Sequence, residues 1–306
     1  MTDATLEHAD RGQAVAETFT EVKGTRIFSL QARVEAPRGL VLALHGGGYD
    51  ANYWHHPGYP DASLLTMAAA LGYDAVAVDR PGIARSAEGL PAGLSVPDQS
   101  NLLFGLIERE RAGNCPVYVI GHSLGGITAL TMADDPRAPE TIAGIEVSGV
   151  PVRFPAERDA EMRAGLDTVR QAGETHGGVM DREARRAMFF GEPGSYDEAL
   201  VAWGSTEHSV AIIEMDDVVA WPSELPRIAG GMSIPLQWTT STIENSSEAG
   251  PDVLEEVQAM FAASRHARFE TQEASGHNIS LHHVARAYHL RALAFFEAVA
   301  AMNRGS

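Results

Sequence analysis

The feature that most constrains this chain is the run Gly-His-Ser-Leu-Gly-Gly at residues 121–126. Residues 116–120 before it are mostly apolar and β-branched, which predicts a buried strand, and residues 127–134 after it have a helical pattern. A serine between glycines at a strand-to-helix junction indicates a sharp turn that exposes the hydroxyl, and glycines leave room for such a turn. We therefore predict that Ser123 is a nucleophile held on a strained turn.

The alternation of strand and helix continues along most of the chain. A hairpin is predicted over residues 19–34, and the chain closes with a predicted helix over about residues 281–302. Short apolar runs predict six further strands at residues 40–44, 73–78, 116–120, 142–147, 234–240 and 267–272. Strands that alternate with helices imply a mostly parallel sheet covered on both faces. We therefore expect an α/β fold.

Residues 152–231 interrupt this alternation with helical patterns and no convincing strand. We expect a helical cap there, so that residues 1–151 and 232–306 form the core. Such a cap would cover the carboxyl ends of the strands, where ligands bind in open α/β sheets. Most bulky apolar residues of the cap should pack its helices, while a few should face a pocket and favour an apolar substrate: Met162, Met188, Phe189, Phe190, Trp203, Met215 and Trp221.

A serine hydroxyl needs a base, and that base needs an orienting acid, to act as a nucleophile near neutral pH. His277 is the candidate base because it follows a glycine at a strand-to-helix turn near the end of the chain. The acid should lie in the loop after residues 234–240, where Glu244 is the first choice. Glu248, in the same loop, and Glu146, near the end of an earlier strand, remain alternatives.

Attack on a carbonyl also needs backbone N–H groups that point at the developing oxyanion. One N–H is expected from Leu124, at the start of the helix that follows the serine. The other is expected from the run His-Gly-Gly-Gly at residues 45–48, because glycines let the backbone curl around an oxygen. Gly47 is the first choice for this second donor and Gly48 is the second.

Aromatic and histidine side chains near these segments are expected to bind substrate: Tyr49, Tyr53, Trp54 and His122. The adjacent pair His55 and His56 does not indicate a metal site, because neighbours in sequence rarely ligate one ion together. No dinucleotide-binding glycine pattern follows the early strands. We therefore expect a small-molecule substrate, no metal and no cofactor.

The net charge of −18 argues against nucleic acid and anionic membranes as partners. No apolar run reaches the roughly eighteen residues that a membrane span needs, and the acidic first twenty residues do not resemble a signal peptide. We expect a cytoplasmic protein that acts as a monomer or homodimer.

Four segments together resemble the α/β-hydrolase superfamily: residues 45–48, 79–86, 121–126 and 276–277. The resemblance covers about residues 20–302, and it implies an eight-stranded sheet with a lid after the sixth strand and the chain order nucleophile, acid, histidine. One departure is that Thr-Thr-Ser-Thr-Ile-Glu at residues 239–244 replaces the family's usual Gly-x-Asp turn after the seventh strand. The chain is also similar to bacterial hydrolase-like proteins of small-molecule and natural-product metabolism.

Two catalytic hypotheses follow from these residues. In the first, a serine hydrolase cleaves a carboxylic ester, lactone or thioester of a small, largely apolar molecule through an acyl-enzyme on Ser123. In the alternative, the same scaffold catalyses a non-hydrolytic biosynthetic step, such as elimination of acetate, condensation or acyl transfer, with His277 as the proton-transfer base. A non-catalytic ligand receptor is disfavoured by the complete serine and histidine set.

Overall fold

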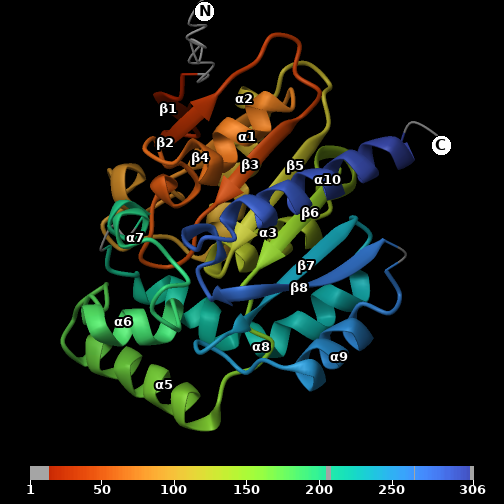
Figure 1. The fold of residues 1–306 in the computed structure, drawn as a ribbon. Coiled ribbons are helices and arrows are strands. Elements are labelled where there is room, and N and C mark those ends of the chain that lie inside the picture. The colour runs from red at the N-terminus through yellow and green to blue at the C-terminus, as the bar shows by residue number, and fades with distance from the viewer. Residues whose placement is uncertain (1–13, 205–207, 265, 304–306) are drawn as a thin grey trace, which may run out of the picture.

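The computed structural model describes residues 14–204, 208–264 and 266–303. Within these ranges the strands form one eight-stranded sheet in the order β1-β2-β4-β3-β5-β6-β7-β8 (Figure 1). Strand β2 is antiparallel to β1 and β4, and every other neighbouring pair is parallel. The strands are β1 (Ala16–Val22), β2 (Thr25–Ala32), β3 (Leu40–Leu44), β4 (Asp74–Val78), β5 (Val117–His122), β6 (Gly144–Ser148), β7 (Leu236–Ile243) and β8 (Ala267–Gly276). The predicted α/β fold with a mostly parallel eight-stranded sheet is confirmed.

Helices cover both faces of this sheet (Figure 1). Helices α1 (Leu64–Ala70) and α10 (Ala285–Asn303) pack together on one face, while α2 (Val96–Glu110), α3 (Leu124–Asp134) and α8 (Ile212–Gly231) pack together on the other. Shorter elements complete the core: η1 (Ala51–Trp54), η2 (Pro60–Ala62), η3 (Ala84–Ser86), α4 (Ala138–Thr141), α9 (Pro251–Met260) and η4 (Ile279–Leu281). None of the helices in the described ranges is long and apolar enough to cross a membrane.

The central strands read as continuous apolar runs because both of their faces are covered. In β3, Leu40, Leu42 and Leu44 belong to the hydrophobic cluster on the α3 face, while Val41 and Ala43 belong to the cluster on the α10 face. Successive side chains of a strand point to opposite faces, so a strand buried on both sides is apolar at every position.

Strand register gathers the ends of several strands at one edge of the sheet. Leu44 of β3 pairs with Gly121 of β5, and His122 pairs with Ser148 of β6. On the far side, Ile243 of β7 pairs with Gly276 of β8 after a register shift. The residues that directly follow these pairs therefore meet at the carboxyl edge of the sheet.

Four helices lie between β6 and β7 in the described residues: α5 (Ala156–Gln171), α6 (Arg182–Phe189), α7 (Glu198–Gly204) and α8. Helices α5 and α6 lie to one side of the sheet, below α7 in this view (Figure 1). The second half of α8 differs, because Trp221, Leu225 and Ile228 are buried in the core cluster that includes α3. The range 152–231 predicted as a cap therefore also contains a helix that covers the sheet.

Helix α8 runs without a break through two prolines. It continues to Gly231 although Pro222 and Pro226 lie inside it. Each proline removes one backbone hydrogen bond. The apolar stripe of Trp221, Leu225 and Ile228 has helical spacing, and its burial against α3 offsets that loss.

Glu146 of β6 lies inside this sheet rather than at its carboxyl edge. Its side chain is fully buried, and Thr239 Oγ1 donates a hydrogen bond of 2.7 Å to its Oε1. Burial raises the pKa of Glu146 from its ordinary 4.5 to about 8. The carboxyl group is therefore protonated in the folded protein at neutral pH.

Glu146 should make the stability of the protein depend on pH. Because the folded state binds this proton more tightly, the stabilisation is complete below pH 4.5, declines as the pH rises and is lost above about 8. Replacement of Glu146 by Gln removes the titration but keeps an oxygen for Thr239. We expect the stability of Glu146→Gln relative to wild type to increase between pH 5 and pH 9, by at most ~1.4 kcal/mol per pH unit.

Thermal or chemical denaturation at the two pH values measures this difference. The matched control is Glu140→Gln, which changes an exposed glutamate and should give the same difference at both pH values. A Glu146→Gln effect that does not vary with pH would contradict the prediction.

Candidate active site

Ser123 lies on the turn that joins β5 to α3. Its backbone angles are φ 53° and ψ −120°, a conformation that costs free energy for any residue other than glycine. Two backbone hydrogen bonds hold it there: the Ser123 N–H donates to the Ser148 carbonyl at 2.7 Å, and the Ile127 N–H donates to the Ser123 carbonyl at 3.0 Å. The turn presents the serine side chain to a cavity at the carboxyl edge of the sheet.

The glycines beside Ser123 permit this turn because there is no space for side chains. A Cβ atom at Gly121 would lie 2.3 Å from the Gly125 carbonyl oxygen, and one at Gly125 would lie 2.2 Å from the Leu44 carbonyl oxygen. At Gly126 it would lie 2.4 Å from Val150 Cγ2. The helix α3 therefore approaches β3 and β5 at a distance that only glycine allows.

His277 and Glu244 follow the paired residues Gly276 and Ile243, and their side chains meet. His277 Nδ1 lies 2.7 Å from Glu244 Oε2, and both side chains are buried. The backbone N–H and the hydroxyl of Ser246 donate to Glu244 Oε1 at 2.8 and 2.5 Å. Burial alone would raise the pKa of Glu244, but His277 and the hydrogen bonds from Ser246 lower it below its ordinary value.

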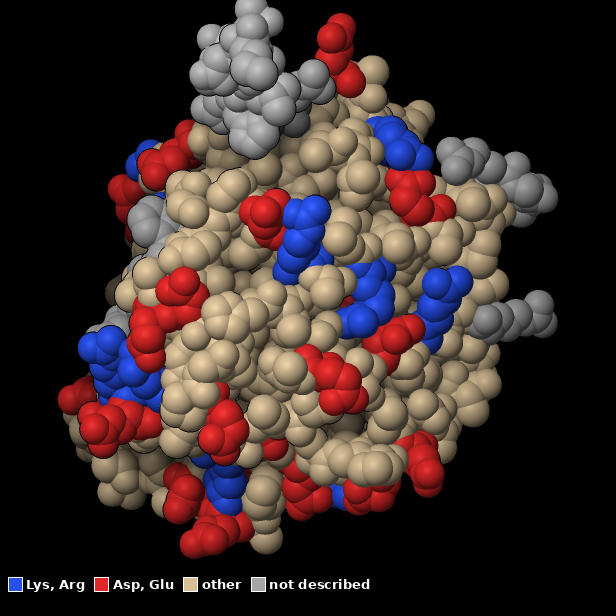
Figure 2. Space-filling view, viewed as in Figure 1, with Lys and Arg blue, Asp and Glu red and all other residues tan. Residues whose placement is uncertain are grey.

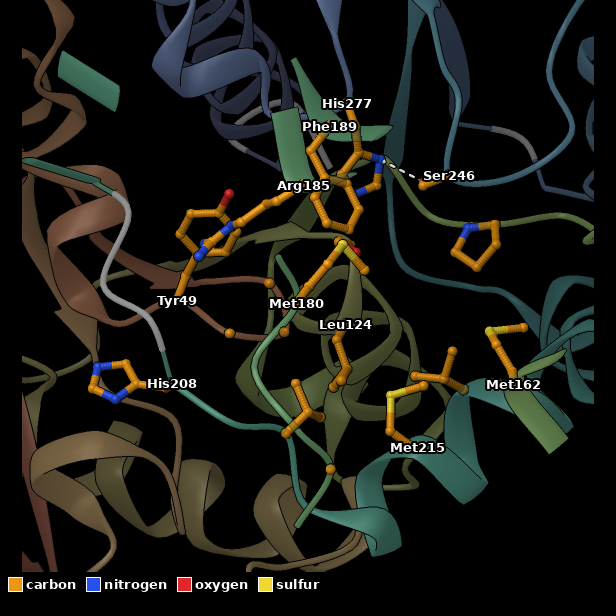
Figure 3. Close-up of a pocket in the computed structure, with 18 of the residues that line it drawn as sticks. Tyr49, Leu124, Met162, Met180, Arg185, Phe189, His208, Met215, Ser246 and His277 are labelled. Carbon is orange, nitrogen blue, oxygen red and sulfur yellow. Dashed lines mark hydrogen bonds between the residues drawn. The ribbon is translucent and has the colours of Figure 1, made fainter. Parts of the chain in front are cut away.

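An ionised Glu244 favours one tautomer of His277. A carboxylate accepts hydrogen bonds only, so Nδ1 carries the proton and Nε2 keeps its lone pair. The Ser246 hydroxyl oxygen lies 3.0 Å from the same Nδ1 (Figure 3). This is the tautomer that can accept a proton from a nucleophile.

The structure brings neither alternative carboxylate to His277. Glu248 forms an ion pair with Arg153, and Glu146 is bonded to Thr239 inside the sheet. Of the three candidates, only Glu244 is placed to orient the imidazole. Ser246, which supports Glu244, has no signal in the sequence beyond its position two residues later.

The glycine loop after β3 is held by a buried polar cluster. His45 Nδ1 donates to the Gly46 carbonyl at 2.8 Å, and its Nε2 accepts the Arg80 backbone N–H at 3.0 Å. Burial, together with the Arg80 charge, lowers the pKa of His45 to about 3, so the ring is neutral. The Arg80 side chain donates to the His45 carbonyl at 2.9 Å and pairs with the buried Glu214 of α8. The loop is therefore attached to both β4 and α8.

The predicted oxyanion segments meet at the cavity beside Ser123. Gly47, Gly48 and Leu124 all line it. Of the three glycines, Gly46 lies closest to Ser123, since a Cβ atom at Gly46 would lie 3.1 Å from the Ser123 Cβ. The N–H of Leu124 is in the first turn of α3 and so has no partner within the helix.

His122 and Asn278 line the cavity and are linked by a hydrogen bond. His122 Nδ1 lies 3.2 Å from Ser148 Oγ, and its Nε2 lies 3.1 Å from Asn278 Oδ1. Asn278 Nδ2 donates to the Tyr49 hydroxyl at 2.6 Å. Burial lowers the pKa of His122 well below its ordinary value, so a neutral ring lies beside His277. Sequence reasoning missed Asn278, although it directly follows the predicted base.

The four predicted substrate-binding residues divide into two pairs. Tyr49 and His122 line the cavity. The prediction was wrong for Tyr53 and Trp54, which are fully buried in the hydrophobic cluster on the α10 face and do not line it. Tyr53 instead stacks on His122, with ring centroids 4.8 Å apart and planes 9° apart.

The cavity has a volume of about 480 Å³ and is mostly apolar. Met162, Met215 and Phe189 of the predicted bulky set line it, together with Met180 (Figure 3). Further apolar residues complete the lining: Leu124, Ile127, Pro151, Phe154, Leu166, Val169, Val179, Val210, Ile212 and Val218.

The rest of the predicted bulky set lies elsewhere. Phe190 and Trp221 are buried in the core clusters, Met188 contacts Arg158, and the Trp203 side chain is outside what the structure describes. Among the described residues, no group of three or more His, Cys, Asp or Glu is arranged to hold a metal ion.

The close approach at Gly125 predicts a severe effect of a single methyl group. Gly125→Ala should destabilise the protein by more than the ~1–3 kcal/mol typical of overpacking, because the clash is with the Leu44 backbone. Gly230→Ala in α8 is the matched control, since its Cβ would meet nothing within 4 Å. Alanine favours helix by up to ~1 kcal/mol over glycine, so this control should keep or raise the melting temperature. Equal melting temperatures for both variants would contradict the packing described here.

Part of the chain is similar in sequence to parts of known enzymes. The chain is 32% identical over 145 residues to Esterase Rv0045c of Mycobacterium tuberculosis, which covers 46% of this chain and 43% of that protein. It is 26% identical over 118 residues to Phospholipase YtpA of Bacillus subtilis, which covers 38% of this chain and 42% of that protein. The matched segment is thus less than half the length of either relative.

Solved structures share the fold over nearly the whole chain. A thioesterase domain from the curacin biosynthetic pathway has a TM-score of 0.66 at 18% identity, covering 92% of this chain and 99% of that one. A monoglyceride lipase from Saccharomyces cerevisiae has a TM-score of 0.67 at 14% identity, covering 92% of each chain. The family model described as "Alpha/beta hydrolase family" matches residues 40–289. Together with the sheet order and the serine turn, this match shows that the chain belongs to the α/β hydrolase family.

Proposed function

We propose that the protein is a serine hydrolase that cleaves a carboxylic ester, lactone or thioester of a small, largely apolar molecule through an acyl-enzyme on Ser123. The observation that carries this proposal is that His277 lines the same cavity as the strained Ser123, while Glu244 lies 2.7 Å from His277 Nδ1 on the side away from that cavity's lining. The apolar lining supports an apolar substrate. The similarity to an esterase and a phospholipase agrees with ester chemistry.

Three side chains and two backbone N–H groups have roles in this reaction. Ser123 Oγ attacks the carbonyl carbon while His277 Nε2 accepts its proton, and Glu244 stabilises the imidazolium that forms. The N–H groups of Leu124 and Gly47 hold the oxyanion. His277 then protonates the departing alcohol or thiol, and the acyl group stays bound to Ser123. A water molecule then attacks the acyl carbon while His277 accepts its proton. The bond from the acyl carbon to Ser123 Oγ breaks, His277 returns the proton to Oγ, and the acid is released.

We also propose that α5 and α6, with α7, act as a lid that selects the substrate. Met162 and Leu166 of α5 and Phe189 of α6 line the cavity opposite the residues that follow the strands. Because these helices are inserted between β6 and β7, their side chains can vary without change to the sheet. Their shape would then decide which acyl or alcohol group enters.

Loss of the Ser123 hydroxyl should abolish turnover. We expect wild-type protein to hydrolyse a panel of 4-nitrophenyl esters, and Ser123→Ala to lower kcat by a factor on the order of 10³ or more. A fluorophosphonate should add one phosphonyl group to wild type at Ser123, detected by intact-mass and peptide mass spectrometry, and none to the variant. An unlabelled, inactive wild type would contradict the proposal. Turnover by Ser123→Ala without an acyl-enzyme would favour the alternative in which His277 only transfers a proton.

The orienting acid can be tested with two glutamates from the same loop. Glu244→Gln keeps the shape of the side chain but removes the charge at His277 Nδ1, so we expect kcat to fall by ~10²–10⁴-fold. Glu248→Gln removes an equal charge that is paired with Arg153 on the surface, and it should leave kcat within about threefold of wild type. Similar losses in the two variants would show that the charge at Nδ1 is not the cause.

A further inference from the structure

The charge of the cavity lining is opposite to the charge of the protein. The chain carries 41 acidic and 23 basic residues, excluding histidine. Acidic side chains outnumber basic ones along the lower edge of the face in Figure 2. Yet no Asp or Glu is among the described residues that line the cavity, whereas Arg158 of α5 and Arg185 of α6 both do.

Arg185 is a buried cation that no described carboxylate neutralises. Arg185 is only 9% exposed to solvent. Its guanidinium lies over the Tyr49 ring, with Cζ 4.5 Å from the ring centroid (Figure 3). Its Nη2 is buried without a hydrogen-bond partner among the described residues. By contrast, Arg80, which is fully buried, pairs with the buried Glu214. Burying a charge without a counterion costs free energy. A ligand that brings a negative charge to Arg185 would remove much of that cost on binding.

Arg158 adds a second guanidinium to the same cavity. It is half-buried, its Nε has no hydrogen-bond partner in the described part of the chain, and its Nη2 lies 2.9 Å from Met188 Sδ, a weak acceptor. Burial lowers the pKa of Arg158, and the charges of Glu161 and Glu244 oppose this shift without reversing it. Each arginine therefore has a buried N–H donor without a partner among the described residues.

We infer that the substrate carries a carboxylate, bound by Arg185 beside Tyr49 with Arg158 as a second cation, in addition to the ester that Ser123 attacks. A guanidinium presents a planar fork of N–H donors that matches the two oxygens of a carboxylate. The Tyr49 ring covers one face of that fork, and the hydrogen bonds that the fork can donate lie in its plane. The inference rests on the proposed ester hydrolysis, and it narrows the substrate class to acidic esters with an apolar spacer.

The test compares esters that differ only in charge. Mono-4-nitrophenyl esters of adipate, pimelate and suberate place a carboxylate on the acyl side, and their methyl esters are the neutral partners. 4-Carboxyphenyl acetate and its methyl ester place the charge on the leaving group. We expect wild type to prefer the acid in at least one arm, measured as the ratio of kcat/KM for acid to neutral ester. A preference for the neutral ester in every arm would overturn the inference.

Variants of Arg185 test whether this residue causes the preference for the acid over the neutral ester. Arg185→Met should lower the ratio by ~10–100-fold, mainly through KM, and Arg185→Lys should fall between it and wild type because the fork is lost while the charge remains. The matched control is Arg182→Met, which removes an exposed arginine from the same helix and should not change the ratio. Circular dichroism and melting temperature confirm that each variant is folded. An unchanged ratio in folded Arg185→Met would overturn the inference.

Binding to Ser123→Ala separates this inference from the proposed function. Titration calorimetry with monomethyl suberate and dimethyl suberate needs no turnover. Tighter binding of the monoacid, lost in Ser123→Ala/Arg185→Met, supports the carboxylate site even if no ester is hydrolysed. Equal affinity for both esters, with hydrolysis of neutral esters by wild type, would overturn the carboxylate site and leave the proposed hydrolase intact.

Discussion

The close contact between α3 and the ends of β3 and β5 is the constraint on which the site depends. Carbonyl oxygens of Leu44 and Gly125 occupy the volume that side chains at Gly125 and Gly121 would need. This contact forces the chain through a positive φ at Ser123, which the hydrogen bond to Ser148 then stabilises. The free energy stored in the turn is supplied by the packing of a large buried core around it.

The parallel strands bring the residues of the site together at one edge of the sheet. Because strands β3 to β8 run in one direction, each contributes the residues that follow its carboxyl end to the same edge. The glycine loop follows β3, Ser123 follows β5, Glu244 follows β7 and His277 follows β8. Buried polar contacts such as Arg80 with Glu214 then attach the loops to neighbouring elements, so that the reacting groups are held in position.

The inserted helices give the cavity a chemistry of its own. The sheet supplies serine, histidine and backbone donors, whereas α5 and α6 supply methionine, phenylalanine and the two arginines. In the function proposed above, residues at the edge of the sheet carry out the reaction and the inserted helices select the substrate. In this chain the insertion places positive charge inside an otherwise acidic protein.

The sequence by itself determined the α/β fold, the serine turn and the candidate base, because periodicity, glycine spacing and chain order are local patterns. Only the tertiary structure chose Glu244 over Glu248 and Glu146, since that choice depends on the β7–β8 register, which carries a shift before Ile243. Tyr53 and Trp54 likewise resemble pocket residues until the packing of the α10 face buries them. The sequence also could not show that Arg185 has no ion-pair partner among the described residues, because counterions come from distant segments whose positions no local pattern encodes.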